Sequence, residues 1–80
     1  MAIKENNKNL LLLTGKRIKH LRKEQGLSLR KLAQRCDVDF SDINKIEKGE
    51  RNMQMTTLFE LAKGLEVHPR DLFDFEMERE

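Results

Sequence analysis

The sequence has few of the residues that define several large classes of protein. Among its 80 residues there is no tryptophan, no tyrosine, one proline and one cysteine. A single cysteine, Cys36, cannot form an internal disulfide, which fits a reducing cytosol and predicts a cytoplasmic protein. Cys36 also falls on the apolar face of an expected helix, which favours a buried thiol over a redox switch.

Long apolar runs and metal-ligand motifs are absent as well. The leucine run at 10–13 has four residues, too few for a secretory signal and far below the ~20 that cross a membrane. His20 and His68 have no matching set of cysteines and histidines, which excludes the usual zinc motifs. No glycine-rich phosphate loop or HExxH motif occurs. We therefore expect no metal, no cofactor, no membrane anchor and no enzymatic activity.

What the sequence does contain is the pattern of a small helical protein. Apolar and charged residues each make up 38% of the chain, β-branched residues are few, and apolar positions recur at helical spacing. We expect an all-α fold, a compact five-helix bundle over residues 10–75. A flexible N-terminal tail at 1–9 and an acidic C-terminal tail at 76–80 would flank it.

Helix boundaries are predicted from capping residues and glycines. The first helix is expected at about 14–25, with a possible start near 10, and a last short helix opens at His68-Pro69. Polar residues stand where a helix start needs a cap, and glycines stand where the chain must leave a helix. They are Ser28, Asp39 and Thr56 at the starts of the second, third and fourth helices, and Gly26 and Gly49 at the ends of the first and third.

Charge is unevenly divided along the chain. Residues 1–51 hold thirteen Lys/Arg and seven Asp/Glu, a net charge of +6, whereas residues 52–80 hold three and seven, a net of −4. A basic front and an acidic rear are typical of a protein that meets a polyanion on one side.

Residues 40–48 would form a helix with one apolar face and one hydrogen-bonding face. The apolar residues are Phe40, Ile43 and Ile46, and the polar residues are Ser41, Asn44, Lys45 and Lys48. Such a helix suits insertion into the major groove of DNA. There, Asn44 could pair bidentately with adenine, and Lys45 could donate to guanine.

The landmarks GKRIKHLRKEQGLS, KLAQ, INKIEKGERN and TLFELAKGLEVHPRDLF occur in that order over about residues 14–73. Together they resemble the lambda-repressor-like helix-turn-helix family, also called Cro/CI or XRE. The resemblance implies a bundle of four or five helices, in which the second and third bind double-stranded DNA. It also implies a homodimer on operator half-sites.

The resemblance further implies roles for individual residues. Base contacts fall on Phe40, Ser41, Asn44 and Lys45, and phosphate contacts on Ser28, Arg30, Lys31, Lys48, Arg51 and Asn52. A buried ion pair would join Arg22 to Glu47. Phe40 has a second interpretation, because it continues the apolar face of its helix and could pack inward instead.

Arg30 and Lys31 support a phosphate site independently of the resemblance. Both stand in the first turn of the second helix, where the helix dipole disfavours cations by ~0.3–1 kcal/mol. A phosphate bound to the free N–H groups there would explain the arrangement.

Several residues depart from what DNA binding would favour. Leu29 replaces a polar residue that many relatives carry near the start of the second helix. Asp39, Asp42 and Glu50 place negative charge near the expected path of the DNA backbone. Asp39 is explained as a cap, whereas Asp42 would either repel DNA or accept a hydrogen bond from a cytosine amine.

We predict a sequence-specific transcriptional regulator, a repressor, that binds DNA as a homodimer. Its dimer surface would involve either Leu10–Leu13 or the last helix with Phe73, Phe75 and Met77. The alternative is an antitoxin or adaptor whose main partner is a protein, which the acidic C-terminal half and the late aromatic residues favour.

Overall fold

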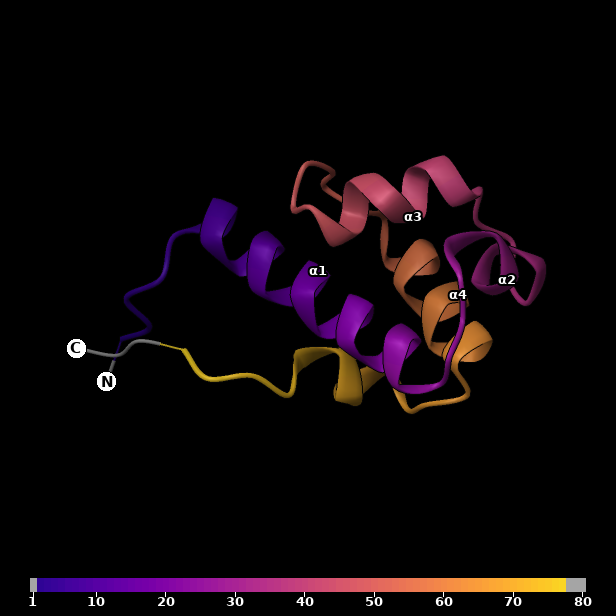
Figure 1. Cartoon of the computed structure of the whole chain (residues 1–80). Coiled ribbons are helices and arrows are strands. Elements are labelled where there is room, and N and C mark those ends of the chain that lie inside the picture. The colour runs from indigo at the N-terminus through magenta and orange to yellow at the C-terminus, as the bar shows by residue number, and fades with distance from the viewer. Residues whose placement is uncertain (1, 78–80) are drawn as a thin grey trace.

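The structure is a computed structural model that describes residues 2–77, and in this range it holds four α-helices and one 3-10 helix (Figure 1). They are α1 (Asn7–Glu24), α2 (Leu29–Gln34), α3 (Phe40–Glu47), α4 (Met55–Leu65) and η1 (Pro69–Phe73). The all-α prediction is confirmed. The five-helix bundle is corrected to four α-helices with a terminal 3-10 turn. In the described part of the chain, no helix is long and apolar enough to span a bilayer.

The last helix is a 3-10 helix because it is short and tightly capped. Pro69 occupies its first turn, as predicted. The His68 ring nitrogen Nδ1 accepts from the Arg70 N–H at 3.1 Å, and the His68 N–H donates to the Asp71 carboxylate at 3.1 Å. These reciprocal bonds satisfy the free amides of a five-residue segment that is too short for a stable α-helix.

The first helix begins earlier than the sequence predicts. Asn6 caps α1, its side-chain oxygen accepting from the Asn9 N–H at 2.8 Å, so the helix starts at Asn7 rather than near residues 10–14. Residues 7–9 of the predicted N-terminal tail are therefore helical. Of the two predicted tails, residue 1 and residues 78–80 lie outside the described residues.

The other boundaries follow the capping predictions in part. Ser28 caps α2 by accepting from the Lys31 N–H at 3.0 Å. Gly26 and Gly49 follow α1 and α3 with φ of 71° and 73°, left-handed conformations that glycine adopts without strain. Thr56 does not cap α4, because this helix begins at Met55 after Gln54, which makes no side-chain cap bond.

The core is filled by large apolar residues from every helix. The largest fully buried side chains are Ile18, Leu32, Ile43, Ile46, Leu61, Leu65 and Leu72. Cys36 is half-buried and packs against this core. Burial raises the pKa of its thiol, which keeps the thiol protonated and poorly reactive, in line with a structural role.

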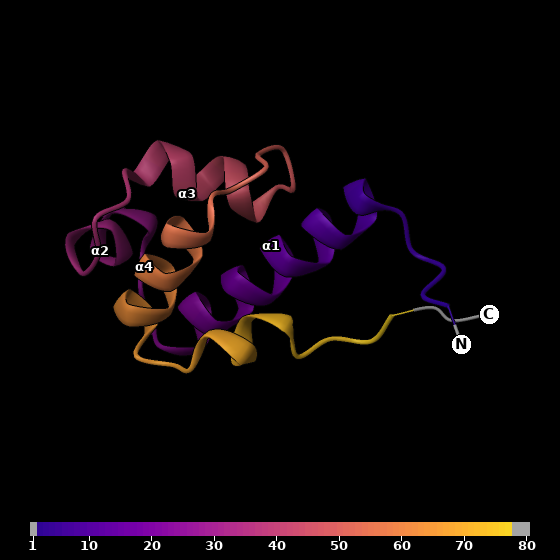
Figure 2. The same ribbon diagram turned by 180° about the vertical axis from the view of Figure 1, so that it is seen from behind.

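The helix α3 lies along α1, and the backbones of the two helices approach each other closely (Figures 1 and 2). Gly15 in α1 lies so near the end of α3 that a Cβ atom there would stand 2.3 Å from the Ile46 carbonyl oxygen. On the other side of α1, Arg17 Nε donates to the Asp71 carbonyl at 2.8 Å and anchors η1. In both views the side of α3 away from α1 and α4 is left uncovered.

Candidate nucleic-acid interface

The turn between α2 and α3 is braced by a carboxylate from α4. Glu60 accepts from the Asp37 backbone N–H at 3.1 Å and from Lys63 Nζ at 3.0 Å. Both bonds favour the ionised carboxylate, and they lower the pKa of Glu60, the bond from Lys63 contributing most. The brace fixes α2 and α3 relative to α4, which sets the angle at which the two helices meet a partner.

The lowered pKa of Glu60 gives a prediction for acid pH. Its stabilising contribution is present above the ordinary pKa of glutamate and is lost as the pH falls through the lowered value. We expect the Glu60 carboxyl carbon, followed by NMR, to titrate below an ordinary glutamate. Lys63→Ala should move the midpoint back up, and a midpoint unchanged by that substitution would contradict the assignment.

Asp39 stands at the N-cap position of α3, but its side chain makes no cap bond to the amides of the helix. Its carboxylate instead accepts from the Ser41 hydroxyl at 2.6 Å, so the predicted cap bond is wrong. Asp42, whose charge was expected near the DNA backbone, pairs with Arg51. Because the Ser41 hydroxyl donates its hydrogen to Asp39, only its oxygen lone pairs remain for other partners.

The four residues expected at base-contact positions lie along α3. Ser41 and Lys45 are exposed, while Phe40 and Asn44 are partly buried. Within residues 2–77, the side chains of Asn44 and Lys45 have no hydrogen-bond or ion-pair partner. Their donors and acceptors are therefore free to bind a partner.

Phe40 joins α3 to α2 through an interaction that the sequence analysis missed. The guanidinium of Arg30 lies over the Phe40 ring, with 4.2 Å between its central carbon and the ring centroid. This is the geometry of a cation–π contact. The two residues are ten apart and separated by a turn, so neither helical spacing nor charge pattern could have revealed it.

The six residues expected at phosphate positions fall into two groups. Ser28, Arg30 and Lys31 stand at the start of α2, and all three are exposed. Lys48, Arg51 and Asn52 follow α3 in the loop that leads to α4. The two groups lie at opposite ends of the pair of helices, as contacts with two stretches of backbone require.

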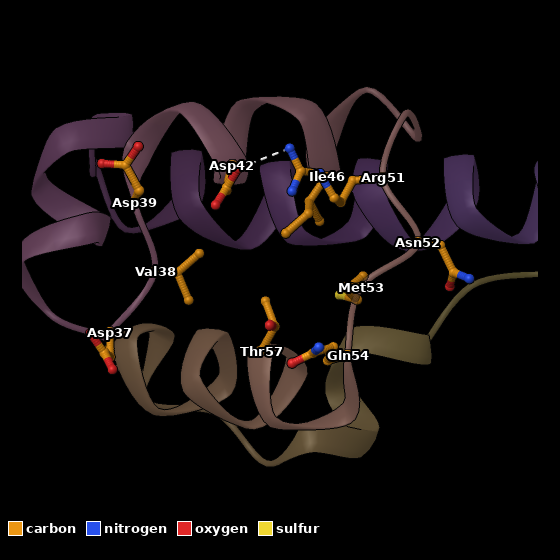
Figure 3. Close-up of a pocket in the computed structure, with 10 residues that line it drawn as sticks. All are labelled: Asp37, Val38, Asp39, Asp42, Ile46, Arg51, Asn52, Met53, Gln54 and Thr57. Carbon is orange, nitrogen blue, oxygen red and sulfur yellow. Dashed lines mark ion pairs between the residues drawn. The ribbon is translucent and has the colours of Figure 1, made fainter.

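Arg51 forms an ion pair with Asp42, the residue whose negative charge was expected to oppose DNA binding. The Arg51 guanidinium lies 3.0 Å from the Asp42 carboxylate, and each side chain is 41% exposed. The pair borders a cleft of about 340 Å³ between α3 and the start of α4, with Asn52 on the loop beside it (Figure 3). Arg51 thus neutralises the carboxylate whose charge would otherwise oppose a DNA backbone.

Arg22 and Glu47 form the expected ion pair. Arg22 Nε and Nη2 donate to the two carboxylate oxygens at 2.7 and 2.9 Å, and Nη1 donates to the Leu27 carbonyl at 2.8 Å. Their side chains are only 8% and 4% exposed. Glu47 raises the pKa of Arg22, so the pair stays charged and locks the end of α3 to α1.

An apolar groove of about 200 Å³ lies on a different part of the surface. It is lined by Leu11, Thr14, Met53, Gln54, Met55, Leu58 and Phe73. Met55 and Phe73 are 66% and 48% exposed, unusual for side chains of their size. The groove brings together Leu11 and Phe73, one residue from each of the two dimer surfaces that the sequence suggested.

Comparisons with known proteins agree with this geometry. A family profile described as Helix-turn-helix matches residues 18–72. Control protein C.BamHI from Bacillus amyloliquefaciens is 37% identical over 68 residues, which cover 84% of either protein.

Solved structures of two further controller proteins share the fold. The restriction-modification controller protein C.AhdI from Aeromonas hydrophila is 36% identical, with a TM-score of 0.77 over 79% of this chain and 96% of that one. The controller protein C.Esp1396I, solved as a tetramer with its natural 35 base-pair operator, is 34% identical, with a TM-score of 0.75 over 81% and 86%. The chain belongs to the lambda-repressor-like helix-turn-helix family.

Proposed function

We propose that this chain is a transcriptional regulator that binds operator DNA as a homodimer, acts in the cytoplasm on the nucleoid, and represses by occupying the operator. Two observations carry the proposal. The side of α3 away from α1 and α4 is uncovered (Figures 1 and 2), and the side chains of Asn44 and Lys45 in this helix have no partner among the described residues. The operator complex of C.Esp1396I, a relative at 34% identity, supports the choice of partner and of an oligomer. The role is binding rather than catalysis.

In this proposal α3 lies in the major groove and reads bases through Ser41, Asn44 and Lys45. Ser28, Lys31, Lys48 and Asn52 hold the flanking phosphates, which gives affinity and orientation rather than sequence preference. Arg51 keeps its ion pair with Asp42 and bridges that carboxylate to a phosphate. One such domain covers little DNA, so two copies on neighbouring half-sites are needed for useful affinity.

Substitutions in α3 test the reading residues. Lys45→Ala and Asn44→Ala should each weaken binding to the preferred operator by ~1–3 kcal/mol and relax the preference at one base pair per half-site. Binding to random-sequence DNA should change little for Asn44→Ala, because the amide carries no charge. Fluorescence anisotropy with the preferred and a scrambled duplex measures both quantities.

Lys19→Ala is the matched control for Lys45→Ala, since Lys19 is exposed on α1 and its side chain has no hydrogen-bond or ion-pair partner among residues 2–77. It should leave DNA affinity unchanged. The proposal is wrong if Lys45→Ala and Asn44→Ala bind the preferred duplex as tightly as the unchanged protein.

The apolar groove supports the dimer part of the proposal. Its rim carries exposed Met55 and Phe73, and a second copy packed there would cover both. The same groove favours the second candidate function, an adaptor that docks on another protein. The two differ in what the protein does alone: a homodimer forms from the pure chain, whereas an adaptor stays a monomer.

We therefore expect Met55→Glu to convert a dimer into a monomer in sedimentation equilibrium, because a buried unpaired carboxylate is costly at an interface. Operator affinity should fall with it, since the half-sites are then bound separately. Lys19→Glu, a charge change on α1 outside the groove, is the control and should leave the dimer intact. A pure wild-type chain that stays monomeric at every concentration would favour the adaptor.

A further inference from the structure

We infer that Arg30 and Phe40 act as one reading unit, which recognises a guanine next to a pyrimidine that carries a C5 methyl group. The inference rests on the proposed DNA-binding function and adds a specificity to it. It moves Arg30 from the residues that hold phosphates to those that read bases, and it gives Phe40 a defined base partner.

The first support is the position of the Arg30 guanidinium. Phe40 is the first residue of α3, and residues at the N-terminal end of a recognition helix are those that contact base edges. The guanidinium carbon stands 4.2 Å from the Phe40 ring centroid, although Arg30 itself belongs to α2. The stacking thus brings a cation from the second helix to the tip of the third.

The second support is that stacking leaves the hydrogen-bonding capacity of Arg30 intact. A guanidinium donates through N–H groups at its edge, whereas it stacks through its face. Arg30 is exposed, and its side chain has no hydrogen-bond or ion-pair partner among residues 2–77. By contrast, Arg22 and Arg51 are both engaged with carboxylates. Arg30 is therefore held in place with all its donors free.

The chemistry of the Arg30 guanidinium and of the Phe40 ring decides which bases they recognise. An arginine held in a fixed orientation donates bidentately to guanine O6 and N7, and a phenylalanine ring contacts the C5 methyl of thymine. Because the guanidinium lies directly over the ring, the two groups can meet two neighbouring base pairs at once.

A phosphate contact is the competing assignment for Arg30, and Lys31 provides the matched control. Lys31 lies in the same helical turn and is equally exposed, but no aromatic ring holds it. Losing a phosphate contact weakens binding to all sequences alike and lowers the salt dependence of log K by about 1. Losing a base contact acts only on duplexes that carry the right base.

The test begins with selection by the full chain from duplexes of 35 base pairs, the operator length of the solved complex, with a randomised centre. The most frequent duplex is then measured with thymine, deoxyuridine, cytosine or 5-methylcytosine beside the guanine, and with the guanine replaced. Each is titrated with wild type, Arg30→Ala, Lys31→Ala and Phe40→Leu over a range of salt. Circular dichroism confirms that each variant is folded.

We expect the selected site to contain thymine, the pyrimidine with a C5 methyl group, next to guanine. Arg30→Ala should lose roughly tenfold to a hundredfold in affinity for that site and almost nothing once the guanine is replaced. Deoxyuridine and cytosine, which lack the C5 methyl group, should weaken wild-type binding, and 5-methylcytosine should restore it. This comparison separates the contribution of the methyl group from that of the rest of the thymine base. Phe40→Leu should relax the guanine preference, because leucine cannot hold the guanidinium.

The inference is overturned if Arg30→Ala behaves as Lys31→Ala does, with a uniform loss and a smaller salt slope. It is also overturned if wild type binds the deoxyuridine and thymine duplexes equally well. These results leave sequence-specific binding by α3 in place. Failure of wild type to select any sequence would instead overturn the proposed function itself.

Discussion

Arg22→Ala is expected to lower the free energy of unfolding by about 3–5 kcal/mol, the cost of breaking a buried ion pair from one side. The substitution removes two hydrogen bonds to Glu47 and one to the Leu27 carbonyl, and leaves a carboxylate whose side chain is only 4% exposed. For a domain of this size, such a loss is a large share of the total stability. Urea unfolding followed by circular dichroism measures it.

Two comparisons separate the buried pair from charge pairing in general. Lys63→Ala breaks an exposed pair in α4 and should cost far less, because solvent screens that pair. The double variant Arg22→Met with Glu47→Leu should recover most of the loss, because no charge is then left buried. A cost for Arg22→Ala no greater than that for Lys63→Ala would show that the pair does not hold α3 to α1.

The pair matters for function because it fixes the helix that reads DNA. Glu47 is the last residue of α3, and Arg22 reaches it from α1 while also bonding to the segment before α2. The Arg22 side chain thus holds both helices of the DNA-binding unit, through the end of α3 and through the segment before α2. Loss of Arg22 should therefore weaken operator binding even under conditions where the variant remains folded.

The sequence predicts those features of the fold that depend on local chemistry. Ser28 is a cap because a hydroxyl can reach the amide three residues on, and Gly26 and Gly49 end their helices because left-handed backbone favours glycine. Periodic apolar residues correctly marked Ile43 and Ile46 as the buried face of α3. The Arg22–Glu47 pair came from family resemblance, since no local rule links residues 25 positions apart.

The sequence does not predict features that arise where helices meet. Asp39 has two available partners, the α3 amides and the Ser41 hydroxyl, and only the folded geometry chooses the hydroxyl. The helix α4 begins at Met55 without a side-chain cap bond. The predicted cap at Thr56 therefore placed the start of this helix too late. Similarly, the stack of Arg30 on Phe40 depends on the angle between α2 and α3, which the sequence pattern does not encode.

Gly15→Ala is expected to destabilise the fold although alanine is the better helix former. Alanine gains about 1 kcal/mol of helix propensity over glycine. Against this, the new Cβ would stand 2.3 Å from the Ile46 carbonyl oxygen and 2.7 Å from that of Glu47. Backbone atoms cannot rotate away as side chains do, so α1 and α3 must separate. We expect a net loss of about 3 kcal/mol, measured by urea unfolding.

Gly64→Ala is the matched control, because Gly64 is also buried inside a helix and gains the same propensity. Its new Cβ would meet only side-chain atoms, Leu32 Cδ1 at 3.0 Å and Cys36 Cβ at 3.2 Å, and these can shift by a few tenths of an ångström. The expected change in stability is therefore small. If both substitutions cost the same, the close backbone approach of α1 to α3 is not what fixes α3. If Gly15→Ala alone weakens both the fold and operator binding, the spacing of these two helices sets the position from which α3 meets DNA.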